Sequence, residues 1–475
     1  MKHLTPGCIA FILFTLPSVA QQGLGTPDKL PILQPGVVLP RVISTKHPEQ
    51  SYAIYLPSQY VPEKYWPIVY AFDPGAQGSL PVERMKDSAE RYGYIVVGSN
   101  NSRNGSWKIE AEAAEAMLQD AQERLAIDRR RVYFAGFSGG ARLAAQLAQL
   151  CKCATGVLLN GAGFEPEAFV PSDAPFVVFT GVGTYDFNYG EIVRMDDALE
   201  KLRYAHFLRR FDGPHQWAPS SAMDEALAWF RLQAMKSGRE SRDDSFIAAV
   251  AAQEAGRAHA FELSGDRYAA WKEYRQAAEA IVGLTDNASL RSRAETLEKD
   301  ITVRESVKRE AQEFEEQDRI TRDISSELSE LRRMPANRTD LRADVGQKIT
   351  DLRGRADHEK HEERLRVLKR ALAGVMVQAM EMGFECLDQK QPAIARDYFE
   401  LACDADPGSV WALRNLAVSR ALDGDRKGAL QALRSAKSKT KEPGQFAEWL
   451  KEEPAFAKLR GMPEFTAILE VSPRR

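Results

Sequence analysis

The sequence is poor in cysteine, and beyond its N-terminal end it has no long uncharged hydrophobic run. Five cysteines among 475 residues cannot form a disulfide framework, so hydrophobic cores must stabilise the fold. A membrane-spanning helix needs about 20 consecutive apolar residues, and no downstream stretch supplies them. We therefore expect no transmembrane segment once an N-terminal signal has been removed.

The sequence also lacks an excess of charge of one sign. It has 64 lysines and arginines against 67 aspartates and glutamates, a formal net charge of −3, whereas nucleic-acid-binding proteins usually present a basic face. Nucleic acid is therefore not an expected partner. The 44% hydrophobic and 28% charged residues are typical of a globular protein. A chain of this length exceeds what one hydrophobic core organises, so we expect two or more domains.

The cysteines after residue 20 do not form a recognisable metal or redox motif. One residue separates Cys151 from Cys153, unlike the two of a C-x-x-C motif, and no histidine-rich segment lies nearby. We expect these two to be structural. Cys386 and Cys403 would lie on paired helices, where an oxidising compartment could join them. The sequence therefore predicts no metal site.

The first 20 residues have the pattern of a secretory signal peptide. Lys2 precedes an apolar run over residues 8–16, and small residues up to Ala20 end it. The run is too short to span a membrane. We expect an exported protein, periplasmic or secreted, whose signal covers residues 1–20.

From residue 36 to about residue 230 the sequence alternates short β-rich runs with helical patterns, which is typical of a mostly parallel sheet covered by helices and predicts an α/β domain over residues 21–235. Polar residues around His47 join the first two strands, which indicates a leading hairpin. A last helix over residues 221–232 closes the unit. The predicted strands cover residues 36–43, 51–56, 67–72, 94–97, 131–136, 156–159, 175–180 and 206–211.

Past residue 237 glycine, proline and β-branched runs become rare, which predicts an all-helical tail. We expect a helical hairpin over residues 245–285, long charged solvent-exposed helices over 286–375 and helical repeats over 376–470. Small and aromatic residues recur at a spacing typical of stacked helix pairs: Ala258, Phe261, Gly265, Ala270, Tyr274 and Ala277; Gly383, Ala395, Phe399, Ala402 and Pro407; Leu416, Ala417, Ala429, Leu433 and Ala436. This spacing resembles that of tetratricopeptide repeats, and the resemblance implies a groove for a protein partner. Ordinary amphipathic hairpins are the alternative.

A nucleophile elbow is predicted at Gly136-Phe137-Ser138-Gly139-Gly140. A strand precedes this G-x-S-x-G segment and a helical pattern follows it, which is the context that the motif requires. The sharp turn lifts the serine side chain out of the sheet, and glycine tolerates the crowding on either side. A glycine-rich turn without function is the alternative. The flanking strand and helix favour Ser138 as a nucleophile.

A serine nucleophile needs a base, which in turn needs an orienting carboxylate, and in this fold acid and histidine follow the serine in that order. His206 begins an apolar strand, whereas His215 lies in a loop beyond a strand end, so we expect His215 to be the base. The expected acid is Asp186, because it follows the strand over residues 175–180. Other aspartates precede that strand, fall in a helical pattern or lie too close to the histidine along the chain: Asp173, Asp196, Asp197 and Asp212.

An oxyanion hole needs one backbone N–H from the residue after the nucleophile and one from the loop after the third strand. Gly139 would supply the first. In the loop that begins at Asp73, Pro74 has no N–H, so Gly75 or Ala76 would supply the second.

Two further segments are candidate pocket walls. Asn100 and Asn101 begin a polar loop at the sheet edge that carries active sites in such folds, and Trp217 follows shortly after His215. A polar surface loop and a packed loop tryptophan are the alternatives.

The segments around Ser138, Asp186 and His215 resemble those of α/β-hydrolase esterases, namely dienelactone hydrolases, phospholipase/carboxylesterases and polyhydroxybutyrate-depolymerase-like enzymes. The resemblance covers residues 36–230. It implies that serine is the nucleophile, aspartate the acid and histidine the base, acting on esters through an acyl-enzyme with no metal or organic cofactor. The departure is at Asp73, Pro74 and Gly75, where relatives usually carry a His-Gly pair.

We therefore expect an exported hydrolase that acts on a small-molecule or lipid-like carboxylic ester. Its helical tail would bind a protein partner or restrict access to the site. One alternative is a non-catalytic interaction scaffold with a degenerate hydrolase module; the complete set of serine, histidine and aspartate argues against it, whereas the unusual loop at Asp73 leaves it open. The other is an amide or peptide hydrolase, because the same three side chains cleave both kinds of bond.

Overall fold

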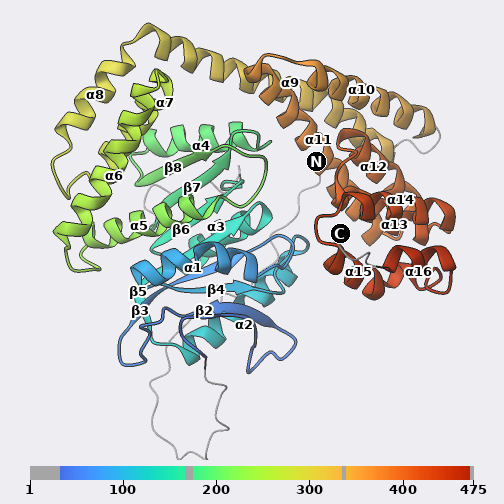
Figure 1. Ribbon diagram of the computed structural model, residues 1–475, viewed down its shortest axis with the longest axis horizontal. Helices are drawn as coiled ribbons and strands as arrows, with labels where there is room; N and C mark the ends of the chain where they lie inside the picture. Colours follow the sequence, from blue (N-terminus) through green and yellow to red (C-terminus); the bar gives the residue numbers. More distant parts are fainter. Residues whose placement is uncertain (1–32, 166–174, 334–337, 471–475) are drawn as a thin grey trace, which may run out of the picture.

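The structure is a computed structural model that describes residues 33–165, 175–333 and 338–470. The expected signal peptide at residues 1–20 lies outside these ranges. Figure 1 shows a sheet domain and a helical tail that begins beside it and runs around it to the C-terminus. No helix within the described ranges is long and apolar enough to cross a bilayer.

The described residues form one eight-stranded sheet in the order β1-β2-β4-β3-β5-β6-β7-β8. β2 runs antiparallel to β1 and β4, as the predicted leading hairpin requires, and the other neighbours run parallel. The bounds are β1 Val38–Ile43, β2 Ser51–Tyr55, β3 Trp66–Phe72, β4 Ile95–Ser99, β5 Ile127–Phe137, β6 Gly156–Asn160, β7 Val177–Gly183 and β8 His206–Phe211. This strand order, with a strand–turn–helix at the end of β5, is that of the α/β-hydrolase fold.

Helices cover both faces of the sheet. α1 (Ser79–Tyr92) and α5 (Ser220–Lys236) pack on one face. α2 (Trp107–Arg124), α3 (Gly139–Cys151) and α4 (Tyr189–Lys201) contribute to the core on the other. All of β3 is consequently buried, and a strand covered on both faces has a continuous apolar sequence, as this one does.

The tail is entirely helical within the described residues, as the sequence predicted. Its helices are α6 Asp244–Leu263, α7 Arg267–Ala280, α8 Ala288–Glu298, α9 Ile301–Arg333, α10 Arg338–His358, α11 Glu362–Asp388, α12 Pro392–Ala405, α13 Val410–Leu422, α14 Arg426–Lys439, α15 Pro443–Glu452 and α16 Pro463–Leu469. Short turns join α6 to α7, α11 to α12 and α13 to α14. The Asp266 and Asp425 carboxylates each accept a backbone N–H at the start of the second helix of a pair.

Small residues allow the paired helices to approach closely. A side chain at Gly383 on α11 would collide with the ring of Phe399 on α12. Ala395 and Ala402 on α12 are fully buried, as is Ala429 on α14. The recurring small residues therefore lie where helices of the tail touch.

The described residues between 286 and 375 are mostly helical but are not all exposed to solvent, which corrects the prediction in part. α9 buries Phe314, Leu328 and Leu331, and Arg370 on α11 is only 1% exposed. Between its charged residues α9 carries a stripe of apolar side chains. Phe314 packs against the sheet domain, whereas Leu328 and Leu331 pack against other helices of the tail. The predicted boundary at residue 375 falls inside α11.

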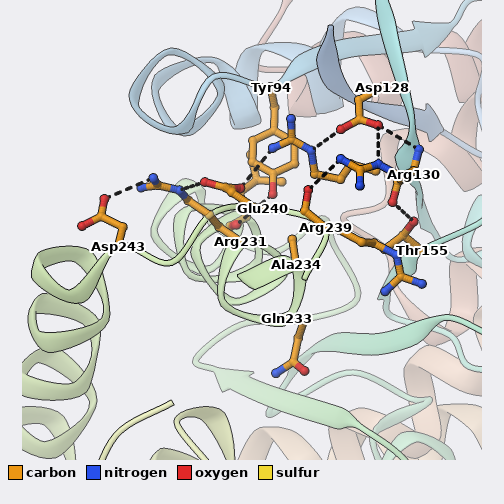
Figure 2. A network of polar contacts seen from close by, with 12 residues as sticks. Tyr94, Asp128, Arg130, Thr155, Arg231, Gln233, Ala234, Arg239, Glu240 and Asp243 are labelled. Carbon is orange, nitrogen blue, oxygen red and sulfur yellow. Dashed lines mark hydrogen bonds and ion pairs between the residues drawn. The ribbon is translucent and has the colours of Figure 1, made fainter. Parts of the chain in front are cut away.

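Ion pairs hold the connection between α5 and α6 to the sheet domain. Glu240 accepts a hydrogen bond from Arg131 on β5 at 3.0 Å. It also accepts one from Arg231 on α5 at 2.7 Å (Figure 2). Arg231 also pairs with Asp243 at 3.3 Å, directly before α6 begins. The start of the tail is thus fixed against both a central strand and the last helix of the sheet domain.

A buried charge network continues this contact. Arg209 on β8 donates to Glu225 on α5 at 2.5 Å and to Glu273 on α7 at 2.6 Å. Arg257 on α6 donates to Glu254 at 3.0 Å. Arg209 and the three glutamates are each at most 9% exposed. Buried charges need partners of this kind, so the edge strand β8 and the first tail helices share one network.

Cys151 and Cys153 form a disulfide, with their Cα atoms 5.1 Å apart. Cys386 and Cys403, whose pairing the sequence left open, are free.

Candidate active site

Ser138 occupies a tight turn between β5 and α3. Its backbone φ is 53°, a conformation that costs a non-glycine residue about 1–3 kcal/mol and is common at functional sites. A side chain at Gly136 would collide with the Gly140 carbonyl oxygen, and one at Gly140 with the Phe72 carbonyl oxygen. The Ser138 N–H donates to the Asn160 carbonyl at 2.9 Å. The glycines are therefore required by close backbone approach, as the sequence predicted.

His215 lies beyond the end of β8 and faces the serine. Its Nε2 lies 2.9 Å from Ser138 Oγ. The imidazole is held between two aromatic rings, with centroid distances of 4.6 Å to Phe137 and 4.4 Å to Phe187. The side chain is 17% exposed, so the ring has one orientation and little contact with solvent.

Asp186 lies in the loop after β7 and reaches the other imidazole nitrogen. Both of its carboxylate oxygens lie 2.9 Å from His215 Nδ1, and the side chain is fully buried. Oδ1 also accepts the Asn188 N–H at 2.8 Å. Because a carboxylate only accepts hydrogen bonds, Nδ1 carries the proton and Nε2 is left to accept the proton of Ser138.

The rival residues lie elsewhere. His206, on the edge strand β8, pairs with Asp196 at 3.3 Å and contacts the Tyr204 carbonyl at 2.7 Å. Asp212 accepts from the Thr184 hydroxyl at 3.4 Å. Asp173 lies outside the described residues. Of the candidates weighed from the sequence, the structure brings together Ser138, His215 and Asp186.

The loop after β3 differs from the sequence-based expectation. The Gly75 N–H donates to Asp73 Oδ1 at 2.8 Å, and the Ala76 N–H donates to the Asp73 carbonyl at 3.1 Å. Neither donor is free to receive an oxyanion, because the Asp73 side chain and carbonyl fold the loop back on itself. Gly139 begins α3, and the first N–H groups of a helix have no partner within the helix.

The side chain of Asn104 lies against Gly139. Its Oδ1 is the atom nearest to the position that a Gly139 Cβ would take, and its Nδ2 lies 3.0 Å from that position. The Asn104 N–H donates to the Pro74 carbonyl at 3.0 Å, which ties the two loops together. The sequence placed this loop at the correct edge of the sheet, but the direction of an individual side chain cannot be read from a polar run.

The three predicted pocket residues have structural roles instead. Asn100 Nδ2 donates to the Pro40 carbonyl at 3.0 Å, and Asn101 Oδ1 accepts the Ser51 N–H at 2.8 Å, so both hold the β1–β2 hairpin. Trp217 is 2% exposed and donates from Nε1 to Asp73 Oδ2 at 2.8 Å. It connects the loop that carries His215 to the loop that begins at Asp73, and it does not form an exposed wall of a pocket.

The tail approaches this site through α11. Burial raises the pKa of Glu381, while the charge of Arg142, and that of His215 when its imidazole is protonated, act to lower it. α11 therefore lies within electrostatic reach of the imidazole. A cavity of about 990 Å³ lies farther away, between the α4–β8 edge and helices α7 and α9, and none of the three assembled residues lines it. The described part of the chain holds no cluster of His, Cys, Asp or Glu suited to a metal ion.

No family model and no curated relative matches the sequence. Among solved structures, the S-formylglutathione hydrolase FrmB of Staphylococcus aureus is 12% identical with a TM-score of 0.34, over 42% of this chain and 98% of that one. A ferulic acid esterase is 18% identical with a TM-score of 0.34, over 41% and 96% of the chains. Esterase LipW of Mycobacterium marinum is 20% identical with a TM-score of 0.33, over 41% and 82%. The α/β-hydrolase fold is identified from the strand order of this chain.

Proposed function

We propose that this protein is a serine hydrolase that cleaves carboxylic esters through an acyl-enzyme. The observation that carries the proposal is the continuous series of contacts from Ser138 Oγ to His215 Nε2 and from His215 Nδ1 to both oxygens of Asp186, each at 2.9 Å. A buried carboxylate, an oriented imidazole and a serine at a strained turn are the groups that acyl transfer needs.

In the proposed reaction, His215 takes the hydroxyl proton of Ser138 as Oγ attacks the ester carbonyl carbon. Asp186 stabilises the imidazolium without taking its proton. When the tetrahedral intermediate collapses, His215 gives that proton to the leaving alcohol oxygen and the acyl group stays on Oγ. Water then attacks the acyl-enzyme by the same sequence, which releases the acid and restores the serine.

The oxyanion is assigned to Gly139 and Asn104. The Gly139 N–H lies at the N-terminus of α3, where unpaired donors and the helix dipole favour negative charge. The Asn104 amide lies against Gly139, and its NH2 group would take the part of the Gly75 and Ala76 N–H groups, which donate to Asp73. A side-chain amide is an effective oxyanion donor when its position is fixed.

For the tail we propose that the helix pairs are tetratricopeptide-like repeats that bind a protein partner or restrict access to Ser138. The close contact of Gly383 with Phe399 and the short turns between paired helices support this. Export to the periplasm or beyond is also proposed. The pattern of residues 1–20 and the disulfide between Cys151 and Cys153 support an oxidising destination.

The test is labelling of the mature protein with a fluorophosphonate probe, followed by turnover of chromogenic esters of graded acyl length. We expect Ser138→Ala and His215→Ala to abolish labelling and turnover. His206→Ala is the matched control, because it removes an imidazole that pairs with Asp196, and should leave both intact. A folded wild-type protein that is not labelled would favour the scaffold. Faster turnover of matched anilides than of esters would favour an amide or peptide hydrolase.

A further inference from the structure

The loop that carries Asp186 is held by two different parts of the chain. We call residues 184–188 the acid loop. The sheet domain holds its N–H groups: Thr184 donates to the Phe211 carbonyl at 2.9 Å, and Tyr185 donates to the Gly213 carbonyl at 2.9 Å. These contacts use N–H groups only, so the carbonyl oxygens of the acid loop remain available to other partners.

The helical tail holds those carbonyl oxygens. Arg370 on α11 donates from Nε to the Thr184 carbonyl at 2.7 Å. Gln317 on α9 donates from Nε2 to the Phe187 carbonyl at 2.8 Å. The two acceptors lie on either side of Asp186 in the sequence, so the tail fixes the backbone before and after the acid.

Both donors are buried, which distinguishes the contact from incidental surface hydrogen bonding. Arg370 is 1% exposed and Gln317 is 7% exposed, although arginine is almost never fully buried unless it is paired. The Arg370 guanidinium lies 4.0 Å from the centre of the Tyr189 ring and 3.5 Å from Glu313. The arginine therefore has a built site between α9 and α4, and its Nε–H donor reaches the acid loop.

The tail also supports the aromatic ring that covers His215. The Cβ of Phe187 lies 3.5 Å from the position that a Gly374 side chain would take on α11. The Phe187 ring lies 4.4 Å from the imidazole, centroid to centroid. Tyr189 donates to Glu310 on α9 at 2.9 Å, directly after the acid loop. Displacement of α9 or α11 would move Asp186 and Phe187 together.

We propose that the tail is part of the catalytic apparatus, with Arg370 and Gln317 as positioning residues that hold Asp186 and Phe187 in place around His215. This inference rests on the proposed serine-hydrolase function. Neither residue touches the reacting atoms; each acts through the acid loop. A shift of about 1 Å in a catalytic group can cost on the order of 100-fold in rate, and the Asp186–His215 contacts are the ones that such a shift would break.

The experiment compares full-length Arg370→Gln, Gln317→Leu and the double variant with wild-type protein. We expect kcat for an ester to fall on the order of 100-fold in Arg370→Gln, with little change in KM because the residue does not contact substrate. The acidic limb of the pH–rate profile should move to lower pH, because the imidazolium loses the carboxylate that stabilises it. Arg370→Lys, which keeps a donor and a charge, should recover part of the rate.

The matched control is Arg396→Gln, which removes an arginine that pairs with Asp423 at 2.6 Å elsewhere in the tail. It should keep the wild-type rate and pH profile. Gln317→Leu removes one neutral donor, and it provides the test of the positioning role if Arg370→Gln does not fold. A folded Arg370→Gln or Gln317→Leu with wild-type kcat and pH profile would overturn the positioning role alone. A folded wild-type protein that is not labelled at Ser138 would overturn the proposed function as well.

Discussion

At the scale of single residues, the sequence showed which residues follow the strand ends better than it showed where their side chains and N–H groups point. The strand–turn–helix context and the order of acid and histidine placed Ser138, Asp186 and His215 at strand ends, and in the structure the imidazole of His215 lies 2.9 Å from the serine on one side and 2.9 Å from the acid on the other. Gly75 and Ala76 were named as donors because they follow Pro74, but Asp73 turns both N–H groups away. A hydrogen bond between a side chain and its own loop leaves no periodic trace in a sequence.

The first prediction concerns Asn104. Replacing it with alanine should lower kcat for an ester about 100- to 1,000-fold, because the oxyanion loses one positioned donor, while KM changes little. Steady-state turnover and the rate of fluorophosphonate labelling measure the effect. Asn100→Ala is the control in the same loop, because its amide donates away from the site to Pro40. Unchanged kcat in Asn104→Ala would remove this residue from the oxyanion hole.

At the scale of elements, composition identified the helices of the tail but not which of their faces are buried. Frequent charges across residues 286–375 suggested exposed helices, yet Arg370 is buried and pairs with the largely covered Glu313. Pairing of this kind depends on residues far apart in the chain and cannot be read from a local pattern. The same holds for Arg209 on β8, whose partners come from three later helices.

A second prediction follows from that network. Burial, together with the charge of Glu225, raises the pKa of Glu254 to about 8 from an ordinary value of 4.5. The folded state therefore binds more protons than the unfolded state between these pH values, and the free energy of unfolding falls as the pH rises through this window. The slope from this group is at most about 1.4 kcal/mol per pH unit.

Glu254→Gln should remove this dependence, because the amide resembles the protonated acid and does not titrate. Denaturant unfolding across pH 4.5 to 9 measures it, and the variant should gain stability relative to wild type as the pH rises. Glu295→Gln on α8 is the control, since this glutamate is exposed and should leave the wild-type profile unchanged. Parallel pH profiles for wild type and Glu254→Gln would mean that the network holds no extra proton.

At the scale of the whole molecule, the sheet domain and the tail share an extensive contact. It includes the ion pairs around Glu240, the network around Arg209 and the contacts of α9 and α11 with the acid loop. The sequence placed the first boundary near residue 235 because composition changes there. Composition does not show that the two parts bury charges against each other. The sequence therefore predicted the two parts but not the interface between them.

The third prediction is that both parts unfold together. Thermal denaturation followed by far-ultraviolet circular dichroism, which the tail helices dominate, should have the same midpoint as the loss of fluorophosphonate labelling at Ser138. If one part unfolded alone, charges of the shared buried networks would lose their partners, which costs free energy. Arg396→Gln provides a tail variant whose two midpoints should also coincide. Loss of labelling well below the helical transition would show that the parts unfold independently.

The contact between Arg370 and the acid loop also has a consequence for the order in which the protein is made. Thr184 and Arg370 are 186 residues apart along the chain, and Arg370 follows Ser138, Asp186 and His215. A chain that emerges from the ribosome or crosses a membrane N-terminus first therefore presents its nucleophile, acid and base before the helix that positions the acid. With the positioning role proposed for α11, hydrolysis would begin only after that late segment has folded, so the nascent enzyme would be inactive without any separate inhibitor.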